Sequence, residues 1–73
     1  MKVEQLLKVT FGRCRIYDFP KNPPLSEIYA YDPDYGCIAD TNKPDTITSK
    51  VLQREVKTVS AGEDFDLKIE VMP

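Results

Sequence analysis

The chain contains no histidine and no tryptophan, and it has two cysteines and three glycines among its 73 residues. Without histidine, serine and cysteine nucleophiles lack their usual general base, so the sequence predicts a protein that is not an enzyme. Cys14 and Cys37 alone supply too few soft ligands for a structural zinc site. The glycines are too scattered to build a phosphate-binding loop. We therefore expect no catalytic residues, no metal and no cofactor.

Long apolar runs are also absent. No run approaches the roughly 20 residues that cross a bilayer, and Glu4 and Lys8 interrupt the start of the chain where a signal core would lie. We expect a protein without membrane contact that stays in the cytoplasm, where Cys14 and Cys37 would be reduced, buried thiols. The formal net charge is −2 and the pI is about 5.0, which argues against generic nucleic-acid binding.

The short length bounds the architecture. A chain of 73 residues builds one domain, 1–73, with one thin core. Domains of this size lie close to marginal stability, and self-association into a homodimer is one way to reach a stable state.

The first half of the chain predicts one helix and three strands. Val3, Leu6 and Leu7 share one side of a short helix. Polar residues alternate with apolar ones over 13–18, which predicts a strand. The stretch 26–32 predicts a second strand, and "YGCIAD" a short third one after the turn "DPDYG".

The second half predicts a helix followed by a hairpin. Asp45 or Thr46 is placed to cap a helix whose inner side carries Ile47, Val51 and Leu52. Residues 55–60 fit either a continuation of this helix or a strand. The strict alternation from Phe65 to Val71 predicts a terminal strand, and a strand at 55–60 would give it a neighbour at small loop-closure cost. We favour that hairpin.

These elements predict an α+β fold: an antiparallel sheet of four to five strands with two short helices on one face. The segments "VEQLLKV", "RIYD", "LQREVKTVSAGED" and "LKIEV" resemble small accessory proteins of phages and prophages of Gram-positive bacteria. Many proteins of that kind are uncharacterised, and some of similar size inhibit host defence systems such as CRISPR nucleases. The resemblance implies a host or phage protein as the partner.

Tyrosines and prolines concentrate in the middle of the chain. If Ile28 and Ala30 face the helices, Tyr29 and Tyr31 lie on the uncovered face, where tyrosine favours protein contacts. Cross-strand packing that shields the sheet is the alternative, and prolines that stiffen a loop explain 20–24 equally. The predicted partner-binding residues are Tyr17, Tyr29, Tyr31, Tyr35, Pro23, Pro24, Asp32 and Asp34.

The function we expect is a non-enzymatic protein-interaction module of phage type, an inhibitor of a host defence protein such as a CRISPR nuclease being one form of it. A second hypothesis is a small-ligand sponge or sensor that holds a nucleotide, since stackable tyrosines accompany Arg13 and Arg15. A third is a purely structural domain of a phage particle.

Overall fold

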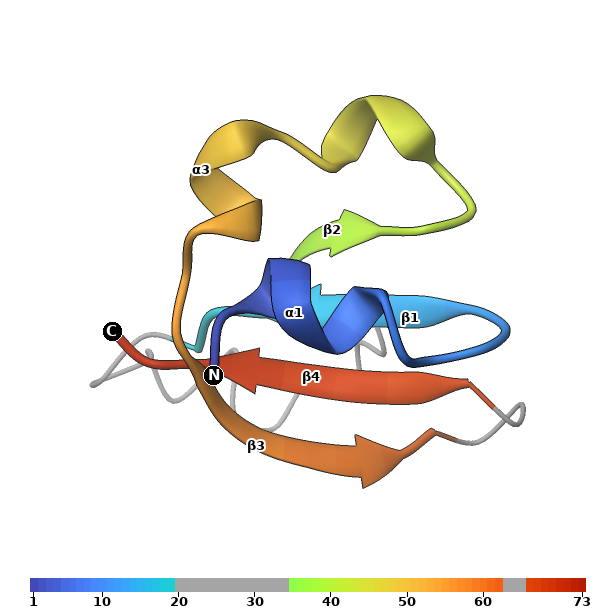
Figure 1. The fold of residues 1–73 in the computed structure, drawn as a ribbon. Helices are drawn as coiled ribbons and strands as arrows, with labels where there is room; N and C mark the ends of the chain where they lie inside the picture. Colours follow the sequence, from blue (N-terminus) through green and yellow to red (C-terminus); the bar gives the residue numbers. More distant parts are fainter. Residues whose placement is uncertain (20–34, 63–65) are drawn as a thin grey trace.

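The structure is a computed structural model, and it describes residues 1–19, 35–62 and 66–73. The described part forms one four-stranded sheet with the strand order β2-β1-β4-β3, and Figure 1 shows the helices α1 and α3 on the same side of it. The elements in chain order are α1 (Val3–Leu7), β1 (Cys14–Tyr17), β2 (Cys37–Asp40), the 3₁₀ turn η1 (Pro44–Thr46), α3 (Ser49–Leu52), β3 (Val56–Ala61) and β4 (Leu67–Val71). The predicted α+β fold is confirmed.

Helix α1 forms where the apolar spacing predicts it. Val3 is buried, and Leu6 and Leu7 pack against the core from the same side. The Gln5 side chain accepts a hydrogen bond from the Lys2 backbone N–H at 2.9 Å, which satisfies a donor at the helix start. Gly12, with φ of +83°, then takes a left-handed backbone conformation before β1.

The sheet is mixed, which departs from the all-antiparallel pairing that we expected. β1 pairs antiparallel with β2 and parallel with β4, with Ile16 opposite both Ala39 and Ile69. β3 and β4 form the predicted antiparallel hairpin. Residues 55–60 are therefore mainly strand, and the helix stops at Leu52. The strand that we predicted over 26–32 lies outside the described residues.

Helix α3 begins later than predicted. The Thr48 side chain caps it by accepting a hydrogen bond from the Val51 N–H at 3.4 Å, so the choice of Asp45 or Thr46 as the cap was wrong. Both of those residues belong to η1 instead. Pro44 explains why a separate turn forms, because proline is well suited to the first position of a helical turn.

The core lies between the helices and one face of the sheet. Its buried side chains come from both helices and from three strands: Val3, Cys14, Ile16, Ala39, Val51, Ile69 and Val71. Cys14 is buried as predicted, whereas Cys37 is half-buried, and both thiols are free. Burial of these aliphatic groups is the main favourable contribution to folding.

Candidate functional site

The sheet face opposite the helices carries charged and aromatic side chains. Because Cys14 and Ile16 point into the core, the alternation of β1 turns Arg13, Arg15 and Tyr17 to the other side. The parallel register places Lys68 of β4 next to Arg15 on this face. This face is the part of the described structure that combines charge, aromatic rings and a pocket, and we treat it as the candidate site.

Arg15 and Asp66 form an ion pair at the centre of this face. The Arg15 Nε donates to Asp66 Oδ2 at 2.5 Å, and the two side chains are 11% and 1% exposed. Burial lowers the pKa of the Arg15 guanidinium, but the hydrogen bond to Asp66 raises it, and the net shift is upward from its ordinary value. This buried pair ties β1 to the residue before β4.

A second ion pair joins β2 to the residue before β1. Arg13 donates from Nε to both carboxylate oxygens of Asp40 at 3.1 and 3.2 Å, and from Nη2 at 2.5 Å. The Asn42 N–H adds a bond to Asp40 Oδ1 at 2.9 Å. The hydrogen bond from Arg13 lowers the pKa of the Asp40 carboxyl, and although burial opposes it, the net pKa lies below its usual value.

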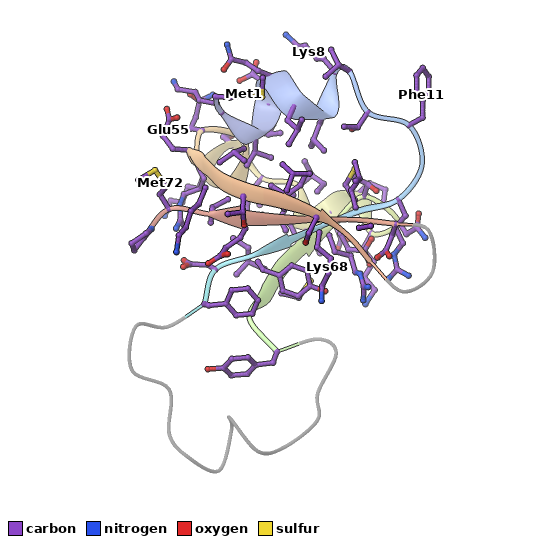
Figure 2. The ribbon with its side chains drawn as sticks, turned by 90° about the horizontal axis from the view of Figure 1, so that it is seen from below. Met1, Lys8, Phe11, Glu55, Lys68 and Met72 are labelled. Atoms are coloured by element: carbon purple, nitrogen blue, oxygen red, sulfur yellow. The ribbon has the colours of Figure 1, made fainter. Side chains whose placement is uncertain are left out.

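Three aromatic rings contact one another in sequence at one end of β1 and form what we call the aromatic cluster: Tyr17, Phe19 and Tyr35. The Tyr17 and Phe19 centroids lie 5.4 Å apart with nearly parallel planes, and Tyr35 lies 6.1 Å from Phe19. The Lys68 ammonium sits 5.2 Å from the Tyr17 centroid, in the range of a cation–π contact. Figure 2 shows Lys68 on this side of the sheet, away from α1.

The backbone at Gly36 lies close against the Phe19 ring. Asp18 donates its N–H to the Gly36 carbonyl at 2.8 Å and accepts a bond from Arg54 Nη2 at 2.9 Å. Gly36 has a φ of +79°, and a Cβ added there would lie 2.7 Å from the Phe19 ring. Glycine is required at 36 on both counts.

A pocket of about 280 Å³ lies beside β2. Its walls combine two cationic side chains with small and apolar ones: Arg13, Cys37, Ile38, Ala39, Asp40, Lys43 and Thr46. The volume is close to the lower end of the range for small-molecule sites, roughly 300–1,000 Å³. None of the described tyrosines lines it. The nucleotide hypothesis required a pocket lined by both tyrosine and arginine, and among the described residues this pocket has arginine alone.

The predicted contact residues have different outcomes. Tyr17 is 1% exposed, so the prediction that its ring is presented to a partner was wrong: the ring is enclosed among Phe19, Arg15 and Lys68. Tyr35 is half-buried and contacts the Phe19 ring. The other predicted contact residues lie outside the described residues: Tyr29, Tyr31, Pro23, Pro24, Asp32 and Asp34.

Sequence reasoning missed Phe19 and Ile38. Each is a large apolar side chain that remains 39% exposed. The signal for Phe19 was its position directly before a proline, where a strand ends and the residue leaves the sheet. Ile38 gave a weaker signal, since "CIAD" allows either Cys37 or Ile38 to face the core.

Comparisons with protein-family models, with curated proteins and with solved structures find no match to this chain. Within residues 1–19, 35–62 and 66–73, no group of three or more acidic, histidine or cysteine side chains is arranged to hold a metal ion. The described helices are all too short to span a membrane.

Proposed function

We propose that this chain is a non-enzymatic protein-interaction module that binds its partner through Phe19 and Ile38, in the cytoplasm of a bacterial host. The supporting observation is that two large apolar side chains, Phe19 after β1 and Ile38 in β2, each remain 39% exposed. Isolated exposed apolar residues are normal on a protein surface. Here one of the two lines a pocket and the other belongs to the aromatic cluster.

Pre-organisation is the physical advantage of this arrangement. Phe19 is stacked on Tyr17 and confined by Gly36, so its ring loses little freedom when a partner covers it. Aromatic side chains held in this way are typical of the few residues that dominate binding energy. Lys43 on the pocket wall adds a cation, which favours a partner with an acidic group next to an apolar one.

A partner from a phage–host conflict follows from the sequence resemblance and belongs to the same proposal. A small rigid surface suits an inhibitor, because blocking an enzyme requires occupation of a site and no chemistry. Inhibition of a CRISPR nuclease would appear as reduced cleavage of target DNA when the chain is added in molar excess. Unchanged cleavage across a panel of such nucleases would exclude inhibition of a CRISPR nuclease, and the proposal of a protein-interaction module would still stand.

The test of the contact surface is a pull-down from bacterial lysate with the variants Phe19→Ala and Ile38→Ala and the matched control Phe11→Ala. Phe19→Ala removes the proposed contact, and Phe11→Ala makes the same change at a residue that is 96% exposed on the α1 side, as Figure 2 shows. We expect the wild type and Phe11→Ala to recover the same protein, and Phe19→Ala or Ile38→Ala to recover at least about tenfold less. Equal recovery by all four chains would overturn the proposal.

The pocket supports a second proposal, small-ligand binding. Its walls carry two cationic side chains, Arg13 and Lys43, and one anionic side chain, Asp40, while Ile38 contributes apolar surface. This combination suits a small anionic molecule. A nucleotide is a test ligand rather than a favoured one, since the described tyrosines do not line the pocket. Native mass spectrometry of freshly purified protein, with and without Arg13→Gln, checks this: we expect a co-purifying mass that the variant lacks.

A further inference from the structure

β3 is a terminal strand of the described sheet, and no described segment pairs with its outer edge beyond Val56. It stands last in the strand order, beside β4, and forms the lower margin of the fold in Figure 1. Every residue after Val56 in this strand is exposed. An open strand edge presents unpaired N–H and C=O groups to any segment that can add to it.

The hydrogen-bond pattern shows which groups point outward. Gly62 donates its N–H to the Asp66 carbonyl at 2.7 Å, which makes this a hydrogen-bonded pair of the antiparallel ladder. Such pairs alternate along a ladder, so Ser60 faces β4 while the backbone groups of Val59 and Ala61 face outward. Val59 and Ala61 therefore hold the free donors and acceptors of this edge.

The start of the chain demonstrates that this edge accepts an antiparallel segment. Val56 donates its N–H to the Met1 carbonyl at 2.8 Å, and Val3 donates to the Arg54 carbonyl at 2.9 Å. Figure 2 places Met1 beside Glu55. Among the described residues, the edge beyond Val56, toward Ala61, has no backbone partner.

The opposite edge of the sheet is occupied at Asp40, the last residue of β2. At β2, Thr46 Oγ1 accepts from the Asp40 N–H at 2.9 Å and lies 3.1 Å from the Asp40 carbonyl oxygen. Lys43 also donates its N–H to that carbonyl at 2.9 Å. A β3 edge from one copy therefore cannot pair with β2 of the next at this position, which disfavours an open fibre and favours a closed contact.

We propose that β3 pairs antiparallel with β3 of a second copy of this chain, joining two sheets into one continuous sheet about a two-fold axis. With Val59 opposite Ala61 of the second copy, the outward N–H and C=O groups of these two residues meet each other, and the axis passes through Ser60. The apolar side chains of Val59 and Ala61 then meet on the helix side of the sheet, where Val59 is 46% exposed.

Charge is compatible with self-pairing. Lys57 is the one charged residue of β3, and its Nζ lies 3.5 Å from Glu70 Oε1 of its own β4. In the proposed register the two Lys57 residues are six strand positions apart, about 20 Å. The contact is a short strand edge, well below the roughly 1,000 Å² of a stable interface, so the dimer is weak and depends on concentration.

Val59→Pro tests the pairing, because it removes an outward N–H and no bond to β4. Val59→Ala is the matched control, since it shortens the same side chain and keeps the N–H. In sedimentation analysis we expect the wild type and Val59→Ala to pass from one to two copies with rising concentration. We expect Val59→Pro to raise the dissociation constant at least about tenfold.

A second measurement covers the case in which Val59→Pro does not fold. Amide hydrogen exchange in the wild type should slow at Val59 and Ala61 as concentration rises, while exchange at Ser60 stays unchanged. The proposal would be overturned by a single-copy mass up to about 1 mM or by a mass that grows beyond two copies. It would also be overturned if the exchange rate at Val59 did not depend on concentration. Phe19→Ala should leave the dimer intact, so the dimer proposal and the proposed function can be refuted separately.

Discussion

Replacing Asp66 by Asn is the sharpest test of how the sheet face opposite the helices is stabilised. Asp66 is 1% exposed and its carboxylate accepts from Arg15 Nε at 2.5 Å. Asn has nearly the same shape and no charge, so Asp66→Asn leaves the Arg15 guanidinium buried without its counter-charge. Arginine does not give up its proton in proteins, and the charge therefore has no way to neutralise itself.

The expected loss is a large part of the total stability. Removing one partner of a buried ion pair destabilises by about 3–5 kcal/mol. A domain of 73 residues has an unfolding free energy of about 4–11 kcal/mol at 0.05–0.15 kcal/mol per residue. With a urea m-value of about 1 kcal/mol/M for so small a protein, Asp66→Asn should lower the unfolding midpoint by about 3 M or abolish the cooperative transition.

Two companion variants separate charge from packing. Arg15→Met leaves a buried carboxyl that can take up a proton, so its deficit should shrink between pH 7 and pH 4, while that of Asp66→Asn should not change. The double variant R15M/D66N carries no charge at either position and should recover most of the lost stability. The assay is urea unfolding followed by circular dichroism at both pH values.

Additive losses would refute this reasoning. If R15M/D66N is less stable than either single variant, the two side chains contribute through separate contacts and the ion pair is not the unit that matters. A midpoint shift of Asp66→Asn below about 1 M would equally show that solvent screens the pair.

Two further predictions concern the neighbouring residues. Gly36→Ala should lower the thermal unfolding temperature more than Gly12→Ala. The left-handed backbone costs an alanine about 1–2 kcal/mol at either position, but only at Gly36 does the added Cβ meet the Phe19 ring, at 2.7 Å, because nothing lies within 4 Å at Gly12. Equal losses of stability would contradict this prediction. Because the pKa of Asp40 is lower in the folded state, it contributes stability that is present above the unfolded pKa of about 3.9 and is lost as pH falls through the folded pKa. The difference in urea midpoint between the wild type and Arg13→Gln should therefore close from pH 6 to pH 2.5. A constant difference would contradict this prediction.

The sequence predicted local elements well because their signals are local. The alternation over Leu67–Val71 is a period-two pattern with a short turn before it, and the structure has the expected hairpin with Val56–Ala61. The parallel pairing of Cys14 with Leu67 had no such signal. These residues are far apart in the chain, and their pairing depends on the core that both strands cover.

The sequence predicted on which side of the sheet the residues of the candidate site lie, but it did not predict how deeply they are buried. Alternation places Tyr17 opposite the core residue Ile16, which is correct, yet periodicity does not say what covers a side chain. Tyr17 is covered by a stacked Phe19 and two cations, and Arg15 by its bond to Asp66. Thr46 shows a related limit, because its hydroxyl accepts from the Asp40 backbone at the end of β2 and does not cap a helix.

The two proposed contacts use opposite edges of one sheet, and this has a consequence for affinity. Pairing through Val59 and Ala61 leaves Phe19 and Ile38 exposed on each copy, so a dimer presents two identical partner surfaces. A partner that is itself oligomeric, or immobilised, would then be held by both surfaces with an avidity above either single affinity. Val59→Pro should weaken capture on a densely coated surface and leave the affinity for a monomeric partner unchanged, whereas Phe19→Ala should weaken both. If Val59→Pro weakens both as well, β3 contacts the partner directly, and the edge that we assign to a second copy belongs to the partner.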